Sequence, residues 1–285
     1  MTASSARLAT VAAAILFSTG GAVIKTGAFT SAQVSCLRSG IAALVLWGYA
    51  RGRLPISPPT LWASVCYAAT LTLFVASTKS TTSANAIFLQ SVAPLYIFVC
   101  GPWLLGERWT ARDLPHMAAL SVGLVLCLAG QTDATTSAPH PAMGNAYAAL
   151  SGLTWAGTLL WLRRIGRDSA DAWGGLAAVV VGNALAALAA LPAAWPFPAA
   201  PADAWAGVVY LGVFQIGVAY VCLTRAIRHV SALEVSLLLL IEPVLNPLWT
   251  WLVHAERPGT ATLLGGAVIV SATAVRAVTR AHRGA

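Results

Sequence analysis

Ten long apolar runs follow one another along the chain, and they constrain its fold more than any other feature. Each is close to the roughly 20 residues that a helix needs to cross a hydrocarbon layer of about 30 Å. The runs are continuously apolar, whereas membrane barrel strands alternate and span about 10 residues, so the runs predict helices. They lie at approximately 8–26, 31–50, 60–78, 81–104, 114–130, 144–162, 173–192, 204–224, 231–252 and 260–278.

The composition agrees with a chain that lies mostly in lipid. Hydrophobic residues make up 58% of its 285 residues and charged residues 9%, against about 25% charged residues in soluble domains. We therefore expect an all-α integral membrane protein with ten transmembrane helices. The first run continues to full spanning length without a clear small-residue cleavage site, so a retained first helix is expected instead of a signal peptide.

The net charge of +8 follows the predicted topology. With the amino terminus in the cytoplasm, three cations fall outside (Lys25, Lys79 and Arg257) and Arg38 lies within the second run. This asymmetry is typical of a multi-pass protein of the inner membrane with both termini in the cytoplasm. No basic cluster interleaved with aromatic residues occurs, so no nucleic-acid partner is expected. The thirteen cations on the inner side are Arg7, Arg51, Arg53, Arg108, Arg112, Arg163, Arg164, Arg167, Arg225, Arg228, Arg276, Arg280 and Arg283.

The two halves of the chain carry the same signature. Pro94 precedes Glu107 by thirteen residues, Pro243 precedes Glu256 by thirteen, and an arginine follows each glutamate. Each half holds five runs, and five is odd, so the second half must enter the membrane from the opposite side, as in many secondary transporters. The sequence thus predicts two inverted-topology repeats, at 1–130 and 144–285, joined by a polar periplasmic loop at 131–143.

These features resemble the drug/metabolite transporter superfamily in its EamA branch, over residues 8–278. Within it, the YddG-like exporters of aromatic amino acids are similar in length and layout. The resemblance implies a secondary transporter that exports small amphipathic metabolites, above all amino acids, by alternating access around a cavity at the membrane midplane. An acid directly before Pro243 is not part of the general superfamily signature, so the resemblance assigns no role to Glu242.

Glu242 lies deep in the ninth run, where a charged carboxylate costs roughly 2.5 to 3.5 kcal/mol. At helical spacing it shares one stripe with Glu234, Asn246 and Trp249. We expect the stripe to face the cavity. Glu242 then recognises a substrate ammonium, carries a proton, or serves structure through a hydrogen bond or an ion pair such as one with Arg38.

Prolines interrupt both the fourth and the ninth predicted helix. Each proline displaces the carbonyl four residues earlier, which is left without its helical hydrogen bond. Pro94, Pro243 and Pro247 are therefore either packing kinks or gates beside the cavity. Arg38 binds a substrate carboxylate through its planar fork, or bonds to backbone carbonyls of another helix. Lys25 and Lys79 are expected to snorkel to the interface, and Glu256 to form an interfacial ion pair or a gate.

Aromatic rings within the runs, beside amides, suit an amphipathic solute. The predicted cavity lining is Glu242, Asn246, Trp249, Tyr96, Gln90, Asn85, Arg38, Trp155, Phe17 and Gln215. No H-E-x-x-H, G-x-S-x-G or Walker A motif occurs, so we expect no enzyme, cofactor or metal site. The five cysteines read as small buried hydrophobes. We expect a monomer, and the alternatives are a multidrug or cationic-compound exporter, an intramembrane enzyme, and a passive assembly subunit.

Overall fold

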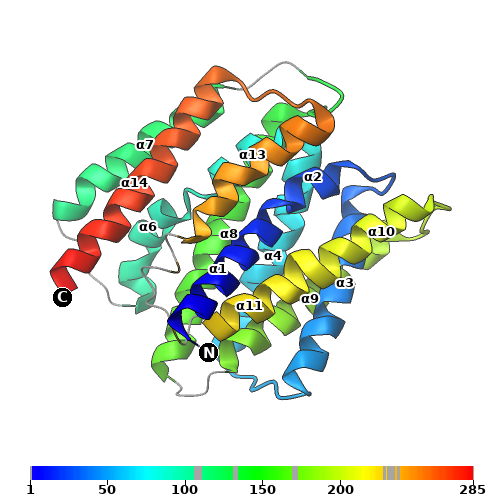
Figure 1. Ribbon diagram of the computed structural model, residues 1–285, viewed down its shortest axis with the longest axis horizontal. Helices are drawn as coiled ribbons and strands as arrows, with labels where there is room; N and C mark the ends of the chain where they lie inside the picture. The colour runs from blue at the N-terminus through cyan, green and yellow to red at the C-terminus, as the bar shows by residue number, and fades with distance from the viewer. Residues whose placement is uncertain are drawn as a thin grey trace.

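Helices form nearly all of the described chain, as Figure 1 shows. The computed structural model describes residues 2–105, 111–130, 134–168, 173–226, 229, 235 and 238–284. No β-strand occurs within these ranges. The elements are α1 (Ala3–Ser18), α2 (Gly20–Lys25), α3 (Ser31–Ala50), α4 (Pro58–Ser80), α5 (Ser83–Gln90), α6 (Ala93–Leu105), η1 (Ala111–Asp113), α7 (Leu114–Ala129), α8 (Pro141–Asp168), α9 (Gly174–Ala194), α10 (Ala202–Tyr210), the π-helix η2 (Leu211–Val218), α11 (Ala219–Ala226), α13 (Ile241–His254) and α14 (Thr260–Gly284).

Local sequence explains where several helices begin. Thr30 and Gln33 form a reciprocal capping box at the start of α3. Ser57 caps α4, and Pro58 occupies the first helical position, where the missing amide proton is not needed. Thr82 caps α5 by accepting a hydrogen bond from the amide of Asn85. Short side-chain caps therefore fix the loops on either side of α4.

Several long apolar runs are interrupted, and the interruptions differ in part from those expected. The break between α5 and α6 falls at Ser91 and Val92, just before Pro94. In the ninth run α13 begins at Ile241, so Pro243 lies in its first turn and only Pro247 lies inside the helix. The amide that Pro243 lacks would have no intrahelical partner there. The helix boundary at Leu240, rather than a Pro243 kink, therefore bends this run.

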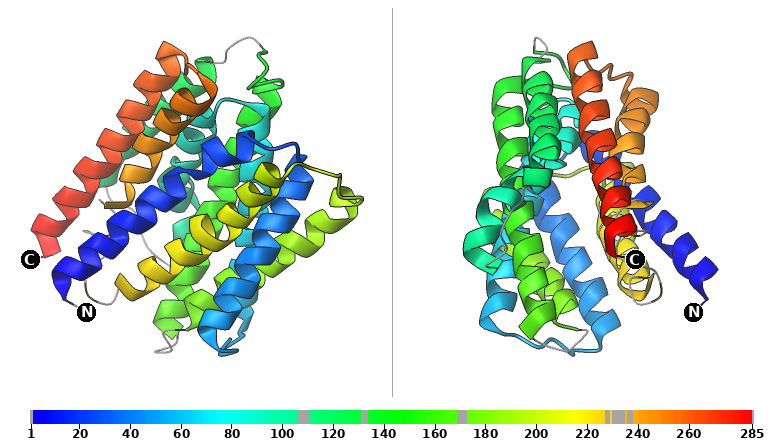
Figure 2. Two further views of the ribbon diagram at one scale, coloured as in Figure 1. Left: turned by 45° about the vertical axis from the view of Figure 1, so that its right-hand side comes forward. Right: turned by 90° about the vertical axis from the view of Figure 1, so that its left-hand side faces the viewer.

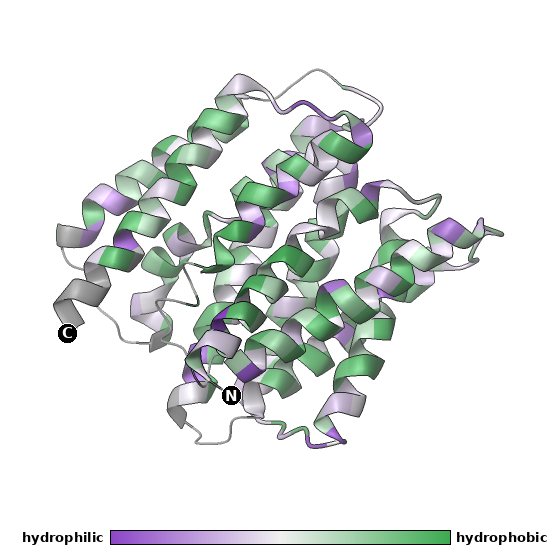
Figure 3. Ribbon diagram, in the orientation of Figure 1, coloured by the Kyte–Doolittle hydropathy of each residue, from purple (hydrophilic) through white to green (hydrophobic). Residues whose placement is uncertain are grey.

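The outer surface of the bundle suits lipid. Within the described ranges, five helical segments are long and apolar enough to cross a membrane: Ala3–Lys25, Pro58–Ser80, Ser83–Leu104, Gly174–Ala194 and Ala202–Ala226. Two shorter apolar helices are Leu114–Ala129 and Thr260–Arg276. Large apolar side chains remain exposed, among them Trp103 at 83% and Leu44 at 69%, and hydrophobic residues dominate the helices in Figure 3. A contiguous apolar exterior of this kind marks a membrane-facing surface. The expected multi-pass membrane protein is confirmed.

Helices of the first half pack mainly against helices of the second half. Figures 1 and 2 show α1 beside the α10–α11 segment, and α7 beside α14 at one edge of the bundle. The helix α3 packs against α9, and α4 packs against both α8 and α9. In addition, α5 contacts α13, and α13 contacts both α1 and α2. The core of the bundle is therefore an interface between the two halves of the chain.

Some predicted features lie outside the described residues, and one predicted loop is shorter in the structure. Glu107 with its following arginine, Glu234, and the first three positions of the predicted 131–143 loop lie outside the described residues. The helix α8 begins at Pro141, so the end of that predicted loop is helical. The five cysteines are free thiols, two of them buried.

Candidate functional site

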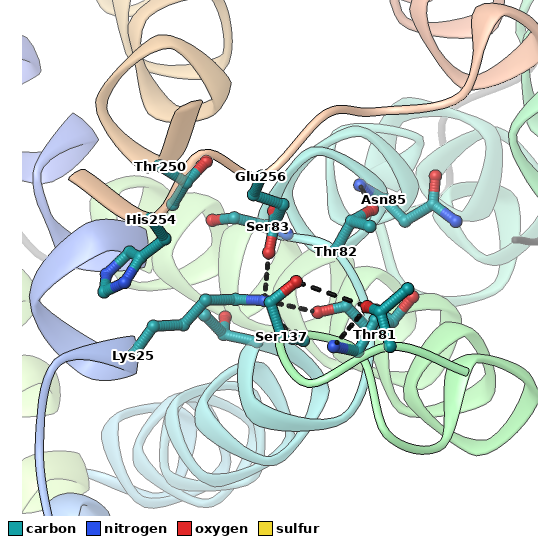
Figure 4. Close-up of polar contacts among 12 residues, drawn as sticks. Lys25, Thr81, Thr82, Ser83, Asn85, Ser137, Thr250, His254 and Glu256 are labelled. Carbon is teal, nitrogen blue, oxygen red and sulfur yellow. Dashed lines mark hydrogen bonds and ion pairs between the residues drawn. The ribbon is translucent and has the colours of Figure 1, made fainter. Parts of the chain in front are cut away.

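A buried lysine ties together one end of the bundle. The ammonium of Lys25 pairs with a carboxylate oxygen of Glu256, and it donates to the carbonyls of Thr81 (2.9 Å) and Ser137 (2.6 Å). The other carboxylate oxygen of Glu256 accepts from the amide of Ser83 at 2.6 Å. Figure 4 shows these groups converging, and we call them the Lys25 cluster. The cluster joins the ends of α2, α4 and α13 to the loop that connects the two halves.

The expectation that Lys25 snorkels to the interface is wrong. Only 5% of its side chain is exposed, and only 2% of that of Glu256. Because three acceptors surround the ammonium, its hydrogen bonds are satisfied inside the protein, as burial of a charge requires. Removing one partner of such a pair leaves the other charge buried and typically costs about 3 to 5 kcal/mol. This end of the bundle is therefore closed by a strong polar contact.

A second layer of contacts lies beneath the Lys25 cluster. The hydroxyl of Ser83 donates to the side-chain oxygen of Asn246 at 2.6 Å. The indole of Trp249 donates to the hydroxyl of Ser18 at 2.9 Å, and a ring nitrogen of His254 lies 2.9 Å from the carbonyl oxygen of Ala22. The helices α1, α2, α5 and α13 are thus held together by side chains, and Asn246 is fully buried among them.

Gly21 permits this close approach. A β-carbon at Gly21 would lie 2.0 Å from the Ser83 hydroxyl oxygen and 2.6 Å from the Asn246 side-chain oxygen. We expect Gly21→Ala to lower stability by about 1 to 3 kcal/mol, as overpacking does, measured by thermal unfolding of the purified protein. Gly27→Ala, whose added carbon meets its nearest atoms at 3.7 Å, is the matched control and should melt like the parent protein. Equal melting of both variants would contradict the packing described.

Two other predicted site residues link α5 to α8. The amide nitrogen of Asn85 donates to the side-chain oxygen of Asn145 at 3.0 Å, and the same oxygen accepts from the hydroxyl of Thr81. The side-chain nitrogen of Gln90 donates to the hydroxyl of Ser151 at 2.6 Å. Both amides therefore bond to side chains of the second half of the chain.

An arginine and a group of aromatic rings occupy the middle of the bundle. Arg38 is 1% exposed, a guanidinium nitrogen donates to the carbonyl of Leu71 at 3.4 Å, and its Nε has no hydrogen-bond partner. The carbonyl contact is the structural alternative expected for Arg38, but it leaves the charge without an acidic partner among the described residues. Arg38 interacts electrostatically with Tyr67 and Tyr220.

The aromatic rings continue from these tyrosines. The rings of Tyr67 and Tyr220 meet edge to face with centroids 5.9 Å apart. Phe17 contacts Tyr220 at 5.2 Å, and Trp155 contacts Tyr67 at 6.3 Å. Asn183 also lies beside Tyr67, and its side-chain nitrogen donates to the carbonyl of Val179 at 2.9 Å. We call Arg38, these four aromatic residues and Asn183 the central cluster.

Glu242 lies near the central cluster without a partner in it. It interacts electrostatically with Tyr67 and Tyr220, but it makes no hydrogen bond or ion pair with any described residue. The ion pair with Arg38, one of the structural alternatives, is therefore not formed. The two tyrosines are the shared neighbours of a cation and an acid that do not touch.

Buried polar atoms around the cluster lack partners. They are the Nε of Arg38, the side-chain oxygen of Asn183, and the side-chain oxygen of Gln215, whose nitrogen donates to the carbonyl of Phe17 at 3.4 Å. Buried polar groups in native proteins are nearly always bonded to protein or water. Unsatisfied donors and acceptors beside aromatic rings form a surface that an amphipathic ligand would complete.

The predicted cavity residues divide into two groups. Arg38, Phe17, Trp155 and Gln215 lie in or beside the central cluster with Glu242, whereas Asn246, Trp249, Asn85 and Gln90 hold helices together elsewhere. Tyr96 is half-buried on α6 and makes no hydrogen bond with a described residue.

Tyr67 and Asn183 are central to the site but are not among the predicted site residues. Nothing in the third apolar run distinguishes Tyr67 from other aromatic residues within the runs. Asn183 lies in the middle of the seventh apolar run, and its amide could have been recognised by the criterion that identified Gln215.

Comparison with known proteins gives a family match. Residues 142–277 match the EamA-like transporter family. The matched residues make up most of the predicted second repeat. The resemblance to EamA-type transporters of the drug/metabolite superfamily is thereby confirmed, while the YddG-like branch stays a prediction.

Full-length relatives support the same assignment. The chain is similar to the pseudopaline exporter CntI of two Pseudomonas aeruginosa strains, with 27% identity over 93% of each chain. It is also similar to an uncharacterized transporter of Archaeoglobus fulgidus, with 26% identity over 71% of this chain and 70% of that protein. A solved crystal structure aligns over 99% of both chains with a TM-score of 0.64 and 23% identity, which shows a shared fold. The P. aeruginosa and A. fulgidus relatives are transporters by name, and together with the family match they support a membrane transporter.

Proposed function

We propose that the protein exports small amphipathic metabolites, above all amino acids, across the inner membrane by alternating access. The supporting observation is Arg38, a buried cation with no acid partner among the described residues, set among aromatic rings. A substrate carboxylate would satisfy the guanidinium through charge-assisted hydrogen bonds. The rings of the central cluster would then cover the apolar part of the same molecule.

We further propose ten membrane crossings in two inverted repeats. Helix contacts support this arrangement. If each apolar run is exchanged with its counterpart five runs away, a contact between two helices becomes another contact that the structure also contains. The contact of α4 with α8 becomes that of α11 with α1, and the contact of α5 with α8 becomes that of α13 with α1. The Lys25 cluster also agrees, since it gathers ends that the ten-crossing topology puts on one side.

In this topology both termini lie in the cytoplasm and the Lys25 cluster lies on the periplasmic side. The structure then represents a state closed toward the outside, with the central cluster beneath the closure. Transport would alternate this state with one in which the Lys25 cluster separates. Rocking of one repeat against the other around a fixed site is common among inverted-repeat transporters.

A second candidate, export of cationic compounds, is favoured by the carboxylate of Glu242, which has no partner among the described residues. In the amino-acid reading the same carboxylate binds the substrate ammonium, so Arg38 and Glu242 take the two ends of a zwitterion. The name of the relative in P. aeruginosa adds pseudopaline-like metabolites to the compounds that a test should include.

The roles of Glu242 are separable in proteoliposomes. We expect Glu242→Gln to reduce counterflow of labelled phenylalanine by about tenfold, because a hydrogen bond to a charged group contributes about 1.5 to 3 kcal/mol. N-acetylphenylalanine, which lacks the ammonium, should compete poorly with the wild-type protein.

Other outcomes assign Glu242 differently. Counterflow that persists in Glu242→Gln while uptake driven by a pH gradient disappears would make it a proton carrier. Movement of a cationic dye without any amino acid would favour the second candidate and overturn the first. Asp203→Asn, which makes the same carboxyl-to-amide change at an exposed position on α10, controls for general effects on assembly.

A further inference from the structure

A cavity lined by arginines opens at the end of the bundle opposite the Lys25 cluster. Its volume is about 440 Å³, and it lies where α3 ends, between the start of α9 and the end of α11. The lining side chains are Tyr49, Arg51, Arg53, Trp173 and Arg225. It is separate from the central cluster, with which it shares no residue.

Contacts in the cavity position the side chain of Arg225 and the backbone of Arg51. The Nε of Arg225 donates to the Tyr49 hydroxyl at 3.1 Å, and its guanidinium carbon lies 5.2 Å from the centre of the Tyr49 ring. Trp173 packs against the same ring, with centroids 6.2 Å apart. Arg51 is the left-handed cap of α3, with φ of 51°, and Gly52 follows with φ of 73°.

The charge in the cavity is not neutralised by described residues. Arg51, Arg53 and Arg225 make no ion pair with an acidic side chain of the described chain. Three guanidiniums around one concave site attract a compact anion, and their planar forks match phosphate oxygens in pairs. The volume is within the range of pockets that bind small ligands, about 300 to 1,000 Å³.

The surface beside the cavity identifies the source of that phosphate. Leu44 and Trp47 are three residues apart, so they share one face of α3, and Arg51 caps the end of the same helix about one turn beyond Trp47. Leu44 is 69% exposed and Trp47 is 54% exposed, on the apolar exterior that faces lipid. An acyl chain lying along Leu44 and Trp47 would bring a headgroup to Arg51. Basic pockets between membrane helices are known headgroup sites.

We propose that this cavity binds the phosphate of an anionic phospholipid, with the acyl chains against α3. The site is independent of the substrate and does not depend on the proposed export activity. On this proposal the arginines of the cavity, and not the net positive charge of the protein, make the site prefer anionic over zwitterionic phospholipid.

Native mass spectrometry of the full-length protein tests this site with phosphatidylglycerol and phosphatidylcholine as probes. The test variant replaces Arg51, Arg53 and Arg225 by glutamine. The matched control replaces Arg7, Arg163 and Arg164 by glutamine, since these are exposed arginines predicted on the same side but outside the cavity. We expect the test variant to bind phosphatidylglycerol at least about tenfold more weakly and the control less than twofold more weakly. Phosphatidylcholine binding should not change.

Several outcomes decide against the proposal. Equal losses in both variants would show attraction by overall charge alone and overturn the cavity, as would undiminished binding by the test variant. A further measurement adds inorganic phosphate to the protein in phosphatidylcholine. If the phosphate stabilises the protein as much as phosphatidylglycerol does, the cavity binds a free anion and the proposal of a lipid is overturned.

If the test variant fails to fold, a second measurement still tests the site. Phosphatidylglycerol with brominated acyl chains should quench tryptophan fluorescence more strongly than brominated phosphatidylcholine at equal density. That excess should fall in Trp47→Phe and in the single variant Arg225→Gln. An unchanged excess in both variants would overturn the placement of the lipid.

Discussion

Replacing Arg38 by alanine is expected to reduce amino-acid counterflow by at least tenfold while the protein remains folded. Hydrogen bonds to a charged group contribute about 1.5 to 3 kcal/mol, which corresponds to roughly 10- to 150-fold in affinity. Arg38 is buried, and its Nε lacks a partner. Because no described acid pairs with it, the substitution leaves no opposite charge stranded, so the loss of stability should come only from the cavity that the side chain leaves.

Chemical variants of the substrate make this test specific. An amino-acid amide, which lacks the carboxylate, should compete weakly with the wild-type protein and should lose little further affinity in Arg38→Ala. Arg38→Lys keeps the charge but not the planar fork, so intermediate counterflow is expected. Thermal unfolding in detergent verifies the fold of each variant. Full counterflow in Arg38→Ala would remove the main support for a carboxylate site.

Neutralising either member of the Lys25–Glu256 pair is expected to open the end of the bundle that the pair closes. Each single substitution, Lys25→Met or Glu256→Gln, should cost the closed state about 3 to 5 kcal/mol, because the remaining charge stays buried. At 1.4 kcal/mol per factor of ten, this amounts to a more than hundredfold change in the opening equilibrium. Hydrogen exchange at the amide of Ser83, which donates to Glu256, reports that opening.

Exchanging the two charges should not restore closure. The carbonyls of Thr81 and Ser137 can only accept, and the amide of Ser83 can only donate. The double variant Lys25→Glu with Glu256→Lys would therefore place each charge against groups of the wrong polarity. Lys79→Met is the control, because Lys79 donates to the carbonyl of Phe29 and has no acid partner among the described residues. Full rescue by the exchange would show that charge attraction alone maintains the closure.

The membrane fold could be predicted from the sequence because hydropathy is a property of each segment on its own. Runs of about 20 apolar residues indicate helices in lipid whatever their neighbours are. The pairing of Lys25 with Glu256 could not be predicted in this way. It depends on which helix ends meet, and two residues 231 positions apart carry no local signal of their contact.

The candidate site was predicted only in part for a similar reason. Helical spacing correctly places Glu242, Asn246 and Trp249 near one face, but it does not say what packs on each turn of that face. Asn246 and Trp249 meet α5 and α1, while Glu242 is one turn deeper, beside Tyr67 and Tyr220. Tyr67 belongs to the candidate site because it lies beside Arg38, Tyr220 and Asn183. These three neighbours come from three other segments of the chain, so the sequence around Tyr67 does not reveal them.

The loop between the two halves contributes Ser137 to the Lys25 cluster. If the proposed alternating access holds, this contact would give the loop a part in the transport cycle. When the ammonium of Lys25 leaves the carbonyl of Ser137, the covalent bridge between the repeats loses an anchor at the same moment as the helix ends separate. The amide of His140 still bonds to the carbonyl of Ser80, so the bridge would swing about that point. The conformation of this predicted periplasmic loop would thus report whether the transport pathway is closed toward the periplasm.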